Sequence, residues 1–249
     1  MADEHLAREQ AFFDASSEAQ FEAEPPPPTE HMAFLLRRLG SATGLRILDC
    51  GCGAGDLANR IAPEAGHVVG FDLSPSSVRL MRARAARAHI APPDGIVSVM
   101  ERLPLDDGCF DAVVGASILH HVDVEAALRE VKRLMKPGGR AIFIENQVTN
   151  PLLRLAREKL TGRFGVARLG TIDEHPLVAR DYAAIRRLFS SVTLHYPDFR
   201  FFGLISRNVL RYRRALWLAR FFAWLDRAIY RWAPPLRRFG YHVIVEVRS

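Results

Sequence analysis

Hydrophobic and polar residues follow two alternating patterns between residues 45 and 145. Short apolar runs, of which Arg46–Cys50 and Phe110–Ala116 are the clearest, are typical of buried strands. Apolar residues three and four apart, as in Ser74–Ala88 and Val124–Met135, predict amphipathic helices. Strands that alternate with helices predict a parallel sheet with helices on both faces. Three further strands are predicted at residues 67–71, 96–100 and 140–145.

The first 44 residues have a different pattern. A helical pattern over residues 5–23 is followed by four prolines, Pro25–Pro28, which form a stiff extended spacer. A second helix is predicted over His31–Leu39 and ends at Gly40. We expect residues 1–44 to form a helical cap or lid on a single α/β domain spanning residues 45–249.

Beyond residue 150 the pattern predicts helices at 151–160 and 178–189, with a loop over 161–176 between them. Alternating residues predict strands at 192–196 and 241–247. The segment between these two strands, residues 203–239, is read as a helical insertion before the last strand.

This insertion has a strongly amphipathic helical pattern. Four arginines form a narrow stripe on a helical wheel, and large apolar side chains cover the other side. Recurring arginines argue against a membrane span, and the composition is typical of a helix lying in a membrane interface. We expect a lid over the acceptor site, either touching a membrane or with its arginines simply in water. The stripe is Arg213, Arg220, Arg227 and Arg231; the apolar set is Trp217, Leu218, Phe221, Phe222, Leu225, Ile229 and Trp232.

Charge is distributed unevenly along the chain. The net charge is +6, but residues 151–249 hold 19 Lys and Arg against 7 Asp and Glu, whereas residues 1–150 hold 15 against 21. Segregated positive charge suggests an anionic partner such as a membrane surface, phosphate or nucleic acid. A solvated arginine surface explains it equally well.

The cysteines and the start of the chain indicate the compartment. Three cysteines are too few for a disulfide framework, and Cys50-x-Cys52 has neither the spacing nor the partners of a zinc site, so we expect no metal. The acidic start Met1–His5 precedes no apolar segment and predicts no signal peptide. A cytoplasmic location is expected, with peripheral contact to the inner face of the membrane left open.

A glycine-rich turn follows the first predicted strand. Gly51, Gly53 and Gly55 would present bare backbone amides at the start of a helix, and Asp72 ends the next strand, where an acid can accept both hydroxyls of a ribose. A nucleoside ligand is therefore predicted. The dinucleotide fingerprint requires a third glycine where this chain has Asp56, which argues against NAD.

These residues resemble the first motif of the class I S-adenosylmethionine-dependent methyltransferases, whose usual form is Asp-x-Gly-x-Gly-x-Gly. The resemblance implies a Rossmann-like three-layer α/β fold with an antiparallel last strand, S-adenosyl-L-methionine as cofactor and S-adenosyl-L-homocysteine as product. The stretches that carry it are Ile47–Gly55, Gly70–Ser74, Glu101–Asp111, Ile118–Val122 and Leu134–Gly139.

The resemblance also implies a cofactor site. Asp49 would order the turn and engage the methionine ammonium, and Asp72 would accept the ribose hydroxyls. Relatives often place an aspartate just before the position of Met100, where this chain has Val99. The full set of implied cofactor residues is Asp49, Gly51, Cys52, Gly53, Gly55, Asp72, Leu73, Met100, Glu101 and Ser117.

Candidate catalytic residues lie at the ligand end of the predicted sheet. Methyl transfer from a sulfonium is an in-line displacement that positioning alone can promote, so a base is optional. His120, His121, His175 and Glu145 are the candidates for taking a proton from a hydroxyl or amine. Each also has a structural interpretation: a histidine at a helix start, a turn before Pro176, or a solvated strand end.

The predicted activity is methyl transfer to a small-molecule acceptor with a large apolar body, such as a lipid, an isoprenoid-derived or a polycyclic compound. A hydrophilic metabolite, a macromolecular acceptor, and a membrane-associated scaffold without turnover are the alternatives. Nucleic acid is not expected, because no amino-base motif follows the fourth strand, at Ala116–Leu119, and basic residues are not interleaved with stacking aromatics.

Overall fold

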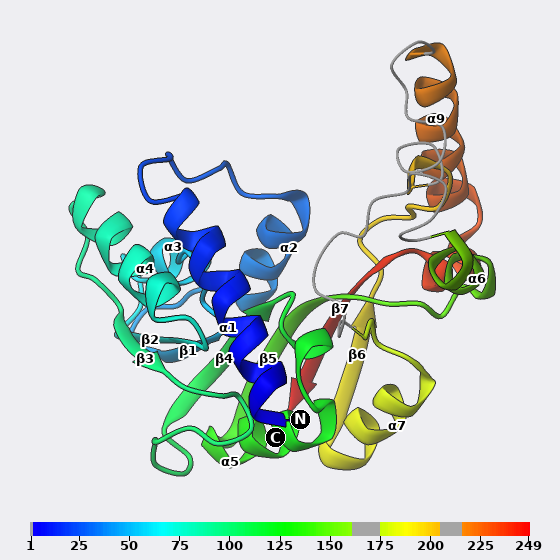
Figure 1. Cartoon of the computed structure of the whole chain (residues 1–249). Coiled ribbons are helices and arrows are strands. Elements are labelled where there is room, and N and C mark those ends of the chain that lie inside the picture. Colours follow the sequence, from blue (N-terminus) through cyan, green and yellow to red (C-terminus); the bar gives the residue numbers. More distant parts are fainter. Residues whose placement is uncertain (1, 161–174, 205–215) are drawn as a thin grey trace.

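A single sheet organises the chain. The computed structural model describes residues 2–160, 175–204 and 216–249. Seven strands lie in the order β3-β2-β1-β4-β5-β7-β6 (Figure 1). Six of them run in the same direction, and β7 runs antiparallel to those six. The predicted parallel sheet with an antiparallel last strand is confirmed. The strands are β1 Arg46–Cys50, β2 His67–Asp72, β3 Asp94–Val97, β4 Phe110–Ala116, β5 Met135–Asn146, β6 Ser191–His195 and β7 His242–Arg248.

Helices cover both faces of the sheet, because successive strand residues point to opposite sides. One core joins Leu48 and Val113 to α5 (Val124–Leu134) and α7 (Ala179–Leu188). The other joins Ile47 and Val114 to α2 (Glu30–Leu39), α3 (Ala58–Ile61) and α4 (Pro75–Arg87). Three layers result, and the carboxyl ends of the parallel strands meet at one edge.

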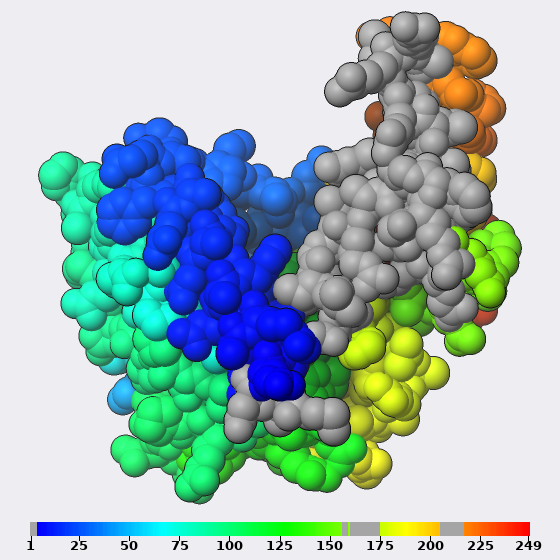
Figure 2. All heavy atoms as spheres, viewed as in Figure 1, coloured from blue at the N-terminus to red at the C-terminus, as the bar shows by residue number. Residues whose placement is uncertain are grey.

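The N-terminal helix α1 (Ala2–Ala19) packs on α4 and forms part of the surface shown in Figure 2. Asp14 Oδ1 accepts hydrogen bonds from Ser74 Oγ at 2.5 Å and from Ser76 N at 3.0 Å. The Ser17 and Ser77 hydroxyls lie 2.8 Å apart. Since Ser74 also caps α4 by accepting from Ser77 N, α1 is fixed to the first turn of that helix.

Two strands differ by more than one residue from the boundaries that the sequence predicts. The third strand was predicted at residues 96–100 but spans Asp94–Val97, because its partner β2 ends at Asp72, which pairs with Val97. Met100 consequently lies in a loop. The fifth strand begins at Met135 rather than at Arg140, and the Pro-Gly-Gly turn forms an irregularity at which the register with β4 shifts.

The last third of the chain contains α6 (Pro151–Leu160), α9 (Leu216–Trp232) and the 3-10 turn η2 (Pro234–Phe239). In Figure 1, α9 projects from the side of the sheet formed by β6 and β7, well apart from α1 and α2. Arg213 and most of the predicted loop 161–176 lie outside the described residues. Within the described ranges, no helix combines the length and apolar character needed to cross a membrane.

Candidate active site

The turn after β1 brings backbone amides to the carboxyl edge of the sheet. Gly51 and Gly53 have φ angles of 64° and 48°, which glycine adopts without steric cost. A Cβ atom at Gly51 would lie 2.8 Å from Ile118 Cδ1, whereas one at Gly53 would meet no atom within 4 Å. Gly53 therefore offers backbone to open space, and it lines the cavity described below.

Two carboxylates hold this turn in place. Asp49, which is 1% exposed, accepts a hydrogen bond from Ala58 N at 3.0 Å and so joins the end of β1 to the start of α3. Asp72, at the end of β2, accepts from Gly53 N and from Ser74 N, each at 2.9 Å. The geometry of the turn thus depends on both acids.

A cavity of about 740 Å³ opens beside the turn. It brings together seven of the ten predicted cofactor residues and three of the four predicted catalytic residues. Asp49, Cys52 and Gly55 do not line it, because they lie beneath the turn. The predicted residues that line it are Gly51, Gly53, Asp72, Leu73, Met100, Glu101, Ser117, His120, His121 and His175.

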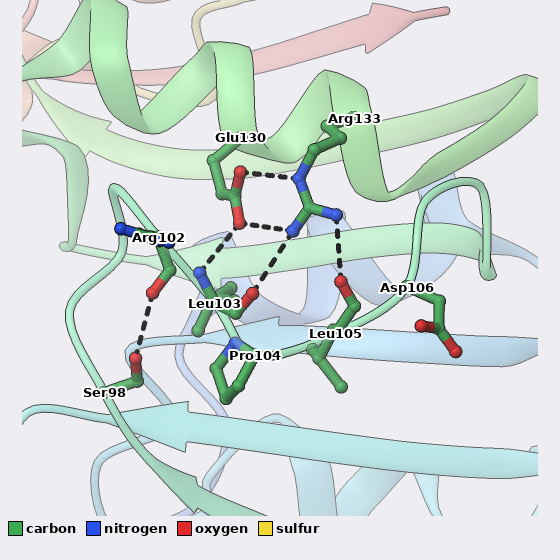
Figure 3. Close-up of a pocket in the computed structure, with 8 residues that line it drawn as sticks. All are labelled: Ser98, Arg102, Leu103, Pro104, Leu105, Asp106, Glu130 and Arg133. Atoms are coloured by element: carbon green, nitrogen blue, oxygen red, sulfur yellow. Dashed lines mark hydrogen bonds and ion pairs between the residues drawn. The ribbon is translucent and has the colours of Figure 1, made fainter.

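One wall of the cavity is the loop that carries Val99, Met100 and Glu101. Figure 3 shows how α5 fixes the continuation of this loop. Glu130 Oε1 accepts from Leu103 N at 2.7 Å, and Arg133 donates to the carbonyls of Leu103 and Leu105 at 3.2 and 2.9 Å. These bonds, with a charge-assisted pair between Glu130 and Arg133, anchor the continuation of this loop to α5.

Glu145 and His120 form a buried pair at the opposite side of the cavity. Glu145 is fully buried at the end of β5 and accepts from Ile118 N at 2.9 Å, Leu119 N at 2.8 Å and His120 Nδ1 at 2.8 Å. A neutral imidazole that donates through Nδ1 has Nε2 as its acceptor nitrogen. The predicted solvated strand end is therefore wrong for Glu145: the carboxylate is buried and orients His120.

The neighbouring histidine pairs with the N-terminal helix instead. His121 Nδ1 lies 3.0 Å from Glu9 Oε2 of α1, and the rings of His121 and Phe13 meet edge to face at 5.3 Å. His5, Leu6, Glu9 and Phe13 all line the cavity. Sequence reasoning missed these four residues because it predicted a cap but could not tell which helical face turns inward.

Two more cavity residues come from the chain before α7. His175 N donates to His120 O at 2.9 Å, and the His175 side chain is exposed at the cavity. Arg180, on the first turn of α7, also lines the cavity with a largely exposed side chain. None of the described residues of 203–239 lines the cavity, so the acceptor-lid role of that segment stays a prediction.

Comparison with known proteins identifies the class. A family model described as "Methyltransferase domain" matches residues 48–143. The chain is 34% identical over 188 residues, 72% of its length and 74% of the relative's, to the ubiquinone/menaquinone biosynthesis C-methyltransferase UbiE of Syntrophotalea carbinolica. This chain belongs to the class I S-adenosylmethionine-dependent methyltransferases. A second relative, the ubiquinone biosynthesis O-methyltransferase of Alkalilimnicola ehrlichii, is 36% identical over 111 residues, which span 44% of this chain and only 45% of that protein.

Solved structures share the methyltransferase fold. Magnesium protoporphyrin IX methyltransferase from Synechocystis, solved with bound S-adenosylhomocysteine, matches with a TM-score of 0.61 and 16% identity, covering 98% of this chain and 99% of that one. Geranyl diphosphate C-methyltransferase from Streptomyces coelicolor matches with a TM-score of 0.59 and 19% identity, covering 87% and 75%. The methyltransferase uses S-adenosyl-L-methionine as its methyl donor.

Asp72, which lines the cavity, and the buried Asp49, which does not, together form an acidic floor beneath the glycine turn. This floor suits the cofactor, which carries a sulfonium and an ammonium group. Burial raises the pKa of Asp49 to about 8, and the charges of Asp72 and Asp56 add to the effect. Burial likewise raises the pKa of Asp72, against the hydrogen bonds from Ser74 and Gly53. Buried acids whose ionised form is disfavoured gain most from a cation, so the methyltransferase has a floor prepared for positive charge.

Gly53→Ala is expected to weaken cofactor binding at least tenfold, because the new methyl group enters the open space beside the cavity. Gly138→Ala is the matched control, since Gly138 also has positive φ, 76°, with no atom within 4 Å of a Cβ, and does not line the cavity. Both variants lose about 1–2 kcal/mol of stability through the left-handed backbone. Calorimetric titration with S-adenosylhomocysteine and thermal melts measure the two effects. Equal affinities in the two variants would refute this role for Gly53.

Proposed function

We propose that this methyltransferase acts on an apolar small molecule of the quinone, isoprenoid-derived or polycyclic class that carries a hydroxyl group. The observation that carries the proposal is the wall of the cavity next to the histidines. Leu6 and Phe13 from α1 and Ile118 and Val122 after β4 form an apolar surface there. Apolar area removed from water contributes roughly 25 cal/mol per Å², which favours a large apolar acceptor over a hydrophilic one.

The relatives support the same class of acceptor. Both curated relatives described above are named for ubiquinone or menaquinone biosynthesis, one as a C-methyltransferase and one as an O-methyltransferase. Arg180, exposed at the cavity, is suited to a carboxylate or phosphate on the acceptor.

His120 is proposed as the general base. In the tautomer whose Nδ1–H donates to Glu145, Nε2 is the acceptor nitrogen, and this atom is proposed to take the proton of an acceptor hydroxyl. When bound, S-adenosyl-L-methionine would supply an electrophilic methyl group to the acceptor oxygen or to a ring carbon conjugated with it, and the electron pair of the broken carbon–sulfur bond would remain on sulfur as a neutral thioether. The buried Glu145 carboxylate stabilises the imidazolium that forms.

We propose that α9 contacts a membrane surface and that the apolar acceptor enters the enzyme from that membrane. Trp217, Phe221, Trp224 and Trp232 are 72%, 46%, 56% and 78% exposed, and they fall within one side of the helix at 100° per residue. Arg220, Arg227 and Arg231 border this side and are exposed. Exposed aromatics beside a row of arginines match the composition of helices that lie at anionic membrane interfaces.

The acceptor class can be tested by incubating the purified enzyme with radiolabelled methyl donor and a lipid extract of the source cell. Label is expected in the organic phase, on a compound with an aromatic or isoprenoid body. Asp72→Ala serves as the background control, because it removes the acceptor of two backbone hydrogen bonds in the turn. Label confined to hydrophilic compounds would overturn the acceptor class. Tight cofactor binding without any labelled product would favour a scaffold.

His120→Gln and Glu145→Gln are expected to lower kcat by about 10²–10⁴-fold with little change in KM, because each substitution disrupts the His120–Glu145 pair that is proposed to take the proton. His195→Gln is the control, because His195 pairs with Glu246 on β7 and does not line the cavity. Unchanged kcat in His120→Gln, or a larger loss in His121→Gln, would move the base away from His120.

Sedimentation with lipid vesicles tests the membrane surface. The enzyme is expected to bind vesicles containing anionic lipid, and Trp217→Ala/Trp224→Ala and Arg220→Glu/Arg227→Glu should each weaken binding at least tenfold. Arg79→Glu is the control, because Arg79 is 64% exposed on α4, away from α9. Binding that all these variants retain, or no binding by the unaltered enzyme, would contradict a membrane role for α9.

A further inference from the structure

Three residues far apart in the sequence converge where the first turn of α2 lies near the start of β7. His31 is in the first turn of α2, Asp198 follows β6, and His242 begins β7. His31 Nε2 lies 3.1 Å from Asp198 Oδ2, and His242 Nδ1 lies 3.1 Å from the same oxygen. The two imidazole rings are 4.2 Å apart, centroid to centroid, and tilted by 45°. Both rings thus direct a nitrogen at one carboxylate.

The distances fit a coordination shell. The three donor atoms all lie within 4.8 Å of one another. A search of the described residues for three or more histidine, cysteine or acidic side chains this close together finds these three residues. Metal–nitrogen and metal–oxygen bonds of about 2.0–2.2 Å imply donor–donor distances of roughly 3.0–3.5 Å in octahedral or tetrahedral sites. The two 3.1 Å separations already fall in this range.

The donors have the chemical character that a transition metal requires. Each of the two histidines offers one ring nitrogen as a ligand atom, and Asp198 offers a carboxylate oxygen. Two imidazoles and one carboxylate favour zinc and neighbouring divalent ions over calcium or magnesium, which prefer oxygen ligands.

The surroundings include one competitor. Arg200 Nε lies 2.7 Å from Asp198 Oδ2, and its side chain is half exposed, so it can turn towards solvent. Asp226 contributes a further negative charge near Asp198. Tyr241 packs edge to face on His242, with ring centroids 5.1 Å apart, and orients that ligand.

We propose that His31 Nε2, the Asp198 carboxylate and His242 Nδ1 bind a divalent transition-metal ion, with zinc the best match, and leave a fourth position for water. The ion would join α2 to β7 and to the segment after β6. The site is separate from the cofactor cavity, since none of its three residues lines that cavity. Its existence does not depend on the identity of the acceptor.

Calorimetric titration of the untagged, chelator-treated full chain with zinc chloride tests the site. One ion per chain is expected to bind, and His31→Gln and His242→Gln should each weaken binding at least tenfold. His195→Gln is the control, because His195 also pairs with a carboxylate, Glu246, but belongs to no such group of three. Zinc should raise Tm in the unaltered enzyme and in His195→Gln only.

Cobalt and Arg200 provide a second measurement that survives poor folding of a histidine variant. Cobalt(II) bound to the unaltered enzyme should give visible ligand-field absorption that zinc displaces. Arg200→Gln should strengthen zinc binding several-fold, because it removes the competing cation; a purely structural His-Asp-His cluster predicts no such gain. No zinc binding by the unaltered enzyme, or binding by His31→Gln and His242→Gln that is as tight as that of the unaltered enzyme, would overturn the proposal.

Discussion

The buried carboxylate of Asp49 is the constraint on which the cofactor end of this methyltransferase depends. It joins β1 to the start of α3, and with Asp72 it fixes the turn that presents the Gly53 amide. Burying two acids so close together disfavours their ionised forms and destabilises the cofactor-free protein. The two buried acids therefore lower the stability of the cofactor-free fold, and a positively charged ligand offsets part of this cost, as is common at binding sites.

Two adjacent histidines that line the same cavity contact different parts of the molecule. His120 is held from inside, by a fully buried glutamate of the sheet, whereas His121 contacts a glutamate of the N-terminal helix. The buried glutamate fixes the ring of His120, as the proposed proton transfer requires. The other partner makes the position of α1 sensitive to the same short stretch of chain. The docking of α1 and the proposed proton transfer therefore depend on two neighbouring histidines.

Sequence reasoning succeeded where the signal was local. The glycine turn, the acid at the end of β2 and the alternation of strands and helices each lie within a short stretch, so the sheet and most of the cofactor wall were predictable. Residues brought together by tertiary packing were not. Glu9 and Phe13 reach the cavity only because α1 docks on α4, and His31, Asp198 and His242 are neighbours only in the folded chain. The end of β3 was misplaced because strand length depends on the partner, β2.

The position of β7 has a consequence for how the chain folds. Residues 242–248 lie between β5 and β6, so β6 has no strand to pair with in the sheet until β7 is in place. During synthesis the edge of β5 stays unpaired until residues 242–248 have been made. Unpaired edges of apolar strands favour association with other chains. Nascent chains of this enzyme are accordingly prone to aggregate before β7 has been made, and deletion of residues 242–248 would remove an interior strand of the sheet.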